Sequence, residues 1–247
     1  MGPMPRPVMS SRRTRVAVAV SIVAGAVAAT TSMVGCSRSV GGAAHLGADA
    51  RAPLEPLLLA PERFPAPYDA RVLSAAEDVD RSLWRIDGAG PDAVVTPPSC
   101  APPRAARPPH NAVATVGTDP GTGATLTVAI TRTASALEQR RAQLAACPTI
   151  TVEVGGLRTE VRPEILAAPP VDADASYAVR QTELVDGARA RSLLTLVAQV
   201  EDIRVTASWS GPDTAGPDAE APDAVGPDAE ALDEVFLDAV LHARRHR

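Results

Sequence analysis

A succession of short runs, in which apolar residues alternate with Thr or other polar residues, constrains the fold of this chain more than any other feature. Gly155-Gly156, Asp186-Gly187 and Glu201-Asp202 each lie between two such runs, and turns of this kind join antiparallel neighbours. A longer turn, Gly117 to Gly121, lies between the first two runs. The pattern predicts strands at 112–116, 124–132, 149–154, 157–162, 176–184, 191–200 and 203–209.

Two helices are expected to accompany these strands. The segment 135–147 begins with Ser135 and Glu138 at capping-box spacing and is followed by Pro148, which ends a helix. The closing segment carries an apolar stripe at helical spacing, and packing on the sheet would bury that stripe. The stripe consists of Leu232, Val235, Phe236, Ala239, Val240 and Ala243.

The first 36 residues have the pattern of an export signal. Arginines precede an uncharged, Ala- and Val-rich run from Val16 to Gly35, which matches the basic and apolar regions of a secretory signal. The end of this run, Met33-Val34-Gly35-Cys36, resembles the lipobox of bacterial lipoproteins. That resemblance implies cleavage before Cys36 and lipid on its thiol. An uncleaved transmembrane anchor and simple secretion are the alternatives, and all three place the following residues outside the cytoplasm.

The remaining thiols, Cys100 and Cys147, are expected to form a disulfide. If Cys36 carries lipid, these are the only two cysteines left, and an extracytoplasmic compartment favours their oxidation. Two buried free thiols are the alternative. A covalent link would assist a core that has few aromatic residues, at 2% of the chain. The predicted fold class is therefore α+β, an antiparallel sheet of about six to seven strands packed against a disulfide-clamped helix and a C-terminal helix.

The chain divides into five predicted segments. Residues 1–35 are a signal peptide and 36–52 a flexible Gly- and Ser-containing tether. Residues 53–209 are an extracytoplasmic domain, which contains a Pro-rich strap around Cys100. Residues 210–230 are a tandem repeat rich in Pro, Asp and Ala, expected to be a disordered insert. Residues 231–247 return to the domain as its last helix.

The sequence nominates no catalytic, metal or cofactor site. His242 and His246 are one helical turn apart, but no carboxylate motif of the HExxH kind accompanies them, and surface histidines are the simpler interpretation. The acidic repeat has neither EF-hand nor calcium-solenoid spacing. Nucleophile and phosphate-loop motifs are missing from the sequence. A net charge of −5 disfavours a general role in nucleic-acid binding.

Three stretches carry a resemblance to known proteins. They are Leu57 to Pro65, Pro97-Pro98-Ser99-Cys100, and the helix that ends in Cys147. In this order they resemble small actinobacterial lipoproteins of the mycobacterial type, of unknown function. They are also similar to the extracellular sensor domain of a receptor Ser/Thr kinase from the same bacteria. That resemblance implies helices packed on an antiparallel, disulfide-stapled sheet, and it carries over no ligand-binding residue.

These features favour a non-catalytic binding or sensor-like module of the cell envelope, on the outer face of the cytoplasmic membrane. Its expected partners are the membrane, through lipid on Cys36, and an unidentified envelope ligand or protein. A lipid or glycolipid carrier is the first alternative and would need an apolar cavity of several hundred Å³. An envelope enzyme with an unrecognised site is the second, and would need a cleft that gathers acids, His110 and an Arg.

Overall fold

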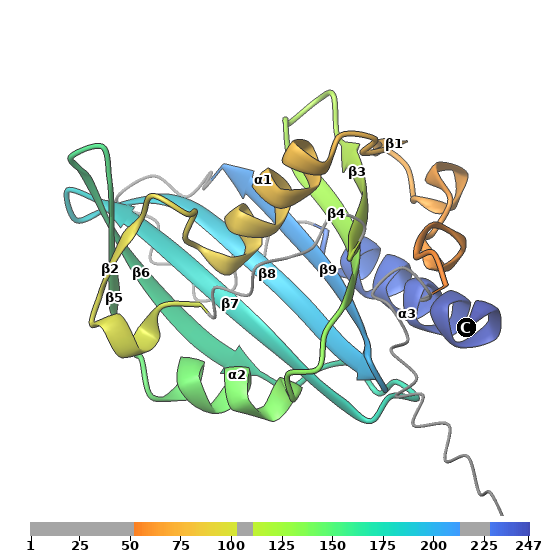
Figure 1. Cartoon of the computed structure of the whole chain (residues 1–247). Helices are drawn as coiled ribbons and strands as arrows, with labels where there is room; N and C mark the ends of the chain where they lie inside the picture. The colour runs from red at the N-terminus through yellow and green to blue at the C-terminus, as the bar shows by residue number, and fades with distance from the viewer. Residues whose placement is uncertain (1–51, 103–110, 213–227) are drawn as a thin grey trace, which may run out of the picture. The chain divides into compact units, whose positions relative to one another are not determined.

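Nine antiparallel strands form one sheet in the computed structural model, which describes residues 52–102, 111–212 and 228–247 (Figure 1). All these residues belong to one compact unit, 48–247. The strand order is β1-β3-β4-β9-β8-β7-β6-β5-β2. The strands are β1 (Asp69–Val72), β2 (Val94–Thr96), β3 (Ala112–Thr118), β4 (Thr125–Arg132), β5 (Ile150–Val154), β6 (Leu157–Leu166), β7 (Ala175–Val185), β8 (Ala188–Val200) and β9 (Ile203–Pro212).

The predicted count of about six to seven strands is wrong, because both edges of the sheet are short strands that the sequence pattern does not reveal. β1 pairs with β3, and β2 pairs with β5. These strands have four and three residues, too few for a recognisable alternation. Short edges also expose few unpaired backbone groups, which limits edge-to-edge association. The prediction of a mixed α+β fold with one antiparallel sheet is confirmed.

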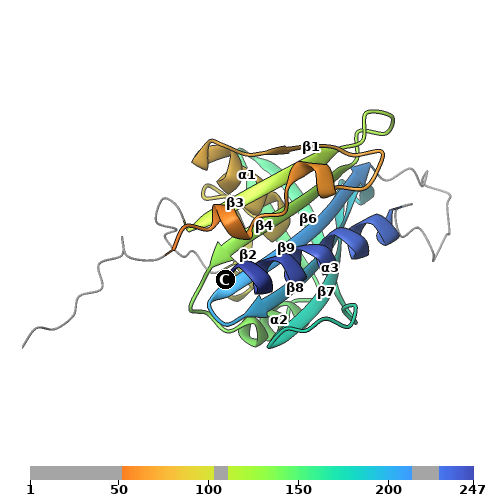
Figure 2. The same ribbon diagram turned by 90° about the vertical axis from the view of Figure 1, so that its right-hand side faces the viewer.

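One face of the sheet is apolar and is covered by α3 (Ala229–His246), which crosses β9 and β8 in Figure 2. All six residues of the predicted stripe of α3 are buried. They pack against alternate residues of the central strands, among them Leu126, Val205 and Trp209. The N-terminal segment closes the same face with two short 3-10 turns, η2 (Glu55–Leu57) and η3 (Pro61–Arg63). This is the largest apolar cluster of the described residues.

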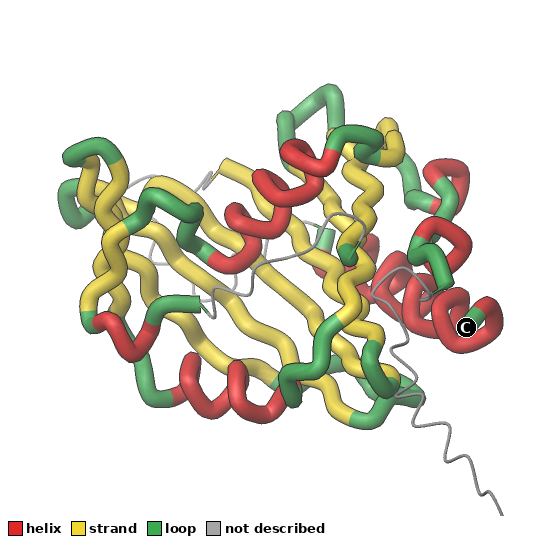
Figure 3. The backbone as a smooth tube through the Cα atoms, in the orientation of Figure 1, coloured by secondary structure: helices red, strands yellow, loops and turns green. Residues whose placement is uncertain are grey.

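The opposite face carries α1 (Ala76–Asp87) and α2 (Leu137–Ala145), which lie on the near side of the sheet in Figures 1 and 3. α1 packs Val79, Leu83 and Ile86 against small residues of β3 and β4. α2 packs Leu137 and Leu144 against β7 and β8. Each helix thus has its own small apolar cluster, and neither covers the whole face.

The structure corrects the predicted start of the helix at 135–147, which is α2. α2 begins at Leu137 rather than Ser135, and no side chain caps it. Ser135 belongs to the preceding turn instead, where its N–H donates to Thr133 Oγ1 (3.1 Å) and its carbonyl accepts from Arg204 (2.8 Å). The N-cap position of α2 is Ala136, which has no side chain able to cap, so Ser135 lies one residue too early for the predicted capping box. The polar segment before Trp84, for which no element was predicted, belongs to α1.

The predicted disulfide joins Cys100 to Cys147, with the two Cα atoms 5.9 Å apart. Cys100 ends the short turn η4 (Pro98–Cys100), and Cys147 follows α2 directly. Both sulfurs are buried among apolar residues of β2, β5 and β6. The bond therefore ties the strap after β2 to the end of α2. Within the described residues, no helix is both long and apolar enough to cross a membrane.

Candidate binding face of the sheet

The face that carries α1 and α2 differs from the α3 face in what it buries. Thr127 of β4 lies opposite Ser208 of β9, and Ser208 lies opposite Thr195 of β8, so three hydroxyl residues form a row across the sheet. Thr206 and Gln181 are buried on the same face. An apolar core would normally exclude such groups unless they are hydrogen-bonded. This surface, between and beneath α1 and α2, is called the polar face below.

A cavity of about 80 Å³ lies on the polar face between the end of α1 and α2. Gln181 and Thr195 line it and are 4% and 2% exposed. Gln181 Oε1 and Thr195 Oγ1 are buried without a hydrogen-bond partner among the described residues. Leaving such a group unpaired costs about 1–3 kcal/mol. Two such atoms at one cavity are available to a water or a ligand that can complete them.

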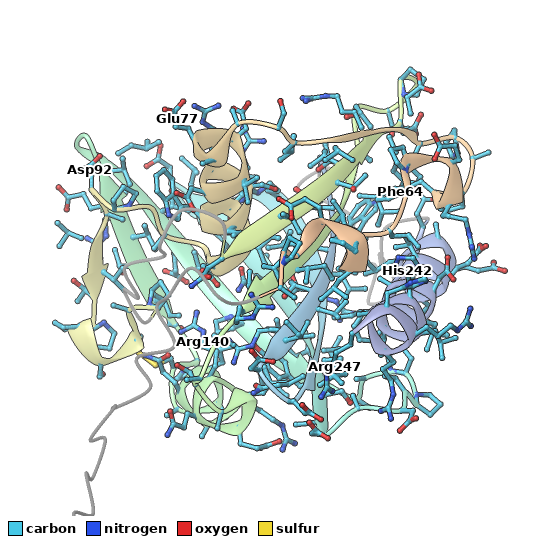
Figure 4. The ribbon with its side chains drawn as sticks, turned by 45° about the vertical axis from the view of Figure 1, so that its right-hand side comes forward. Phe64, Glu77, Asp92, Arg140, His242 and Arg247 are labelled. Carbon is cyan, nitrogen blue, oxygen red and sulfur yellow. A yellow bond between two sulfur atoms is a disulfide. The ribbon has the colours of Figure 1, made fainter. Side chains whose placement is uncertain are left out.

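Arg140 brings a positive charge to this cavity from α2, and Figure 4 shows it on that helix. Its Nη1 donates to Gln143 Oε1 (2.5 Å), and the Gln143 amide donates to the carbonyls of Ser99 and Ala101 (2.6 and 2.8 Å). The disulfide-linked strap therefore positions Arg140 through Gln143. A chain of this kind restricts the side chain more than solvent contact would.

Tyr177 forms another part of the cavity wall, together with Asp87 and Arg204. Burial raises the pKa of the Tyr177 hydroxyl, although Arg140 and Arg204 act in the opposite direction. The hydroxyl is therefore protonated at neutral pH and can donate a hydrogen bond. The cavity thus combines amide, hydroxyl and guanidinium groups within a partly apolar wall.

Two larger hollows lie on either side of α1. The first, of about 240 Å³, is bounded by α1, β1 and the polar ends of β4 and β9. The second, of about 280 Å³, is bounded by α1 and the hairpin of β5 and β6, and includes the exposed apolar residues Trp84, Val154 and Leu157. Arg81, Arg85 and Arg191 border both hollows.

The residues that the sequence singled out lie elsewhere. Cys36, His110 and most of the acidic repeat lie outside the described residues. His242 lies on α3, on the other side of the sheet (Figure 4). Its ring is tilted against that of His246, with 4.3 Å between the ring centroids, and its Nε2 lies 3.0 Å from the Pro56 carbonyl oxygen. In the part of the chain that the structure describes, no three His, Cys, Asp or Glu residues gather as a metal site.

Sequence reasoning did not find the polar face, although its signal is visible in retrospect. Thr125 and Thr127, with Ser208 and Ser210, alternate with buried residues along their strands. Such alternation is typical of a strand with one side in solvent. Only the placement of α1 and α2 shows that this side is partly enclosed.

Comparisons with known proteins find similar structures at low identity. No family model matches the chain, and no curated protein matches it. The extracellular domain of PknH from Mycobacterium tuberculosis is similar, with a TM-score of 0.42 and 12% identity over 76% of this chain and 98% of that one. An uncharacterized Mycobacterium smegmatis protein, the Rv0999 ortholog, has a TM-score of 0.36 and 16% identity over 67% and 96%. Cyanobacterial PsbP from Synechocystis has a TM-score of 0.27 and 15% identity over 58% and 81%.

Proposed function

We propose that this chain is a non-catalytic, extracytoplasmic binding module that holds a small polar group on the polar face of its sheet. The observation that supports this function most is the pair of buried, unpartnered atoms, Gln181 Oε1 and Thr195 Oγ1, at one cavity. The apolar face beneath α3 carries the largest cluster of buried apolar side chains among the described residues, whereas the polar face has hollows and unused hydrogen-bonding capacity. The hollows and the unused hydrogen-bonding capacity support the polar face as the proposed recognition surface.

The chemistry of the cavity defines what it would accept. Gln181 Oε1 accepts a hydrogen bond, so the ligand must present an O–H or N–H group there. Thr195 can donate or accept, and Arg140 donates to an acceptor oxygen. A cavity of about 80 Å³ fits one substituent rather than a whole sugar or nucleoside. The rest of the ligand would lie outside the cavity, next to α1 and α2, which both line it.

A panel of neutral sugars, amino acids and nucleosides tests this proposal through the melting temperature of the chain. We expect a subset to raise the melting temperature of the wild-type chain and to lose that effect in Thr195→Val and Gln181→Leu. Thr182→Val is the matched control, because Thr182 faces away from the cavity on the same strand as Gln181. If no compound stabilises the wild-type chain, or the cavity variants respond equally, the cavity holds only water.

The lipid-carrier alternative receives less support from the hollows. A carrier requires a closed apolar volume of several hundred Å³. The two larger hollows described above reach about 240 and 280 Å³, and arginines border both. Charged walls favour polar ligands over acyl chains. Mass spectrometry of an organic extract of the purified protein provides the direct test, since a carrier would release a stoichiometric lipid.

The proposed location is the outer face of the cytoplasmic membrane, with lipid on Cys36. The support for it is the run from Val16 to Gly35 followed by Cys36. Metabolic labelling with palmitate is expected to label the wild-type chain and to leave Cys36→Ala unlabelled, with the variant released to the medium. An unlabelled wild-type chain that still resists extraction from membranes would support an uncleaved helix instead.

A further inference from the structure

Four arginines converge on the hollow of about 240 Å³ beside α1. Arg81 and Arg85 are one helical turn apart on α1, Arg71 comes from β1, and Arg191 comes from β8. Arg191 is far from the other three in the sequence, and all four line the same hollow. Figure 1 shows α1 packed across the strands, which brings these elements together. The positive charge is notable because the whole chain has a net charge of −5.

The acids nearby neutralise only part of this charge. Asp78 pairs with Arg81 (2.8 Å), and Glu183 pairs with Arg191 (2.5 Å). Within the described residues, Arg71 and Arg85 make no ion pair. Arg191 Nε is buried and has no acceptor there. Two full positive charges and one buried donor are thus available to an incoming anion.

The floor of the hollow supplies hydroxyl groups. Thr127 lies opposite Ser208, and Thr125 lies opposite Ser210, so four hydroxyls form a block on two neighbouring strands. All four line the hollow, and in the described part of the chain their side chains make no hydrogen bond. Hydroxyl donors together with guanidinium groups are the usual partners of an oxyanion. A cation would be repelled, and a neutral sugar would have no need of the arginines.

We propose that this hollow binds the phosphoryl group of an extracytoplasmic ligand. Arg71 and Arg85 would supply the charges, Arg191 a further donor, and Thr127 and Ser208 the floor. A volume of about 240 Å³ is large enough for a phosphate and part of the molecule that carries it. The inference rests on the proposed binding function and deepens it, because it names the ligand chemistry of the neighbouring part of the same face.

Titration calorimetry of the full chain in detergent, at low salt, tests the inference with three phosphate-bearing probes. Inorganic phosphate represents a free anion, a hexose phosphate represents a phosphorylated sugar, and a water-soluble short-chain phosphatidylglycerol represents a lipid headgroup. The matching hexose without phosphate is the neutral control. The probe that binds most tightly identifies the source of the phosphoryl group.

Arg71→Gln and Arg85→Gln are the test variants, because both side chains are exposed and lack ion pairs among the described residues. Each is expected to weaken phosphate-probe binding about tenfold, as expected for one lost charge-assisted hydrogen bond. Arg245→Gln removes the same charge from an exposed position on α3, on the opposite face, and is expected to bind normally.

The outcomes separate this inference from the proposed function. The phosphoryl site is overturned if none of the three probes binds the wild-type chain. It is also overturned if Arg245→Gln weakens probe binding as much as Arg71→Gln and Arg85→Gln do. If neutral compounds still bind in a manner that depends on Thr195, the binding function stands and only the anion site fails. If phosphate probes bind and Thr195→Val has no effect on any compound, the arginine hollow is the binding site and the central cavity is not.

Discussion

Trp209 donates its indole N–H to the hydroxyl oxygen of Tyr68 over 3.1 Å, although the two residues are 141 positions apart. The same hydroxyl donates to Asp228 Oδ2 (2.6 Å), immediately before α3. Tyr68 therefore connects the N-terminal segment, the last strand and the start of the last helix. These contacts join three segments on the apolar side of the sheet.

Replacing Tyr68 by Phe should lower the free energy of unfolding by about 1–3 kcal/mol, because the buried Trp209 N–H and Asp228 lose their partner. Urea denaturation followed by Trp fluorescence measures the change. Tyr177→Phe is the matched control, since Tyr177 is equally buried but its hydroxyl makes no hydrogen bond among the described residues. An equal loss in both variants would show that the hydroxyl of Tyr68 is not specially coupled.

Stability is expected to fall as the pH rises above about 10, the ordinary pKa of tyrosine. Burial, followed by the hydrogen bond to Asp228, raises the pKa of Tyr68, and burial also raises that of Tyr177. The folded chain therefore holds protons that the unfolded chain releases above that pH, so the contribution is intact below it and is lost above it. The chain contains no lysine, so lysine ionisation does not obscure the effect. Thermal melts at a series of pH values above about 10 measure the effect. The melting temperature should fall less steeply with pH in Tyr68→Phe than in the wild-type chain.

Gly211→Ala should destabilise the fold by about 1–3 kcal/mol through overpacking. A Cβ atom at Gly211 would lie 2.6 Å from Cζ2 and 2.7 Å from Cη2 of Trp209, whose buried ring has little room to move. Gly90→Ala is the control, because the nearest atom of Trp84 would lie 3.8 Å away. Chemical denaturation should place Gly90→Ala within about 0.5 kcal/mol of the wild-type chain. If Gly211→Ala leaves the free energy of unfolding unchanged, the Trp209 ring can move to make room for the added methyl group.

Removing the disulfide by Cys100→Ala together with Cys147→Ala should cost about 4 kcal/mol in the chain-entropy model. The bond closes a loop with a sequence separation of 47 residues and holds the strap that positions Gln143 and Arg140. Unfolding of the wild-type chain with and without reductant provides an independent check. Reduction that leaves the unfolding midpoint unchanged would contradict this role.

Asp119 should contribute to stability at neutral pH and lose that contribution in acid. Its carboxylate accepts from the Thr122 hydroxyl (2.5 Å) and from the Gly121 N–H (2.8 Å), which lower its pKa. A lowered pKa in the folded state stabilises the fold above about pH 3.9, and the effect disappears as the pH falls below that value. Asp119→Asn should therefore reduce stability at pH 7. In thermal melts at a series of acidic pH values, the melting temperature of this variant should fall less steeply with decreasing pH than that of the wild-type chain.

Much of the sheet was predictable because its central strands and turns are local features. Asp186-Gly187 and Gly155-Gly156 both adopt positive φ at each residue, as tight hairpin turns require. The stripe from Leu232 to Ala243 is likewise a property of one helix and is fully buried. β1 and β2 were missed because three or four residues carry no periodicity and gain their pairing from β3 and β5.

The sequence alone determined the antiparallel pairing, the apolar side of α3 and the pair of cysteines available for oxidation. These follow from alternation, helical spacing and cysteine number, which are readable along the chain. Tertiary structure decided which polar residues became buried. Gln181 and Thr195 read as ordinary strand residues until α1 and α2 enclose them, and Arg71 meets Arg85 and Arg191 only where α1 crosses the sheet. The physical reason is that desolvation and charge convergence depend on distances in space, which the order of residues does not specify.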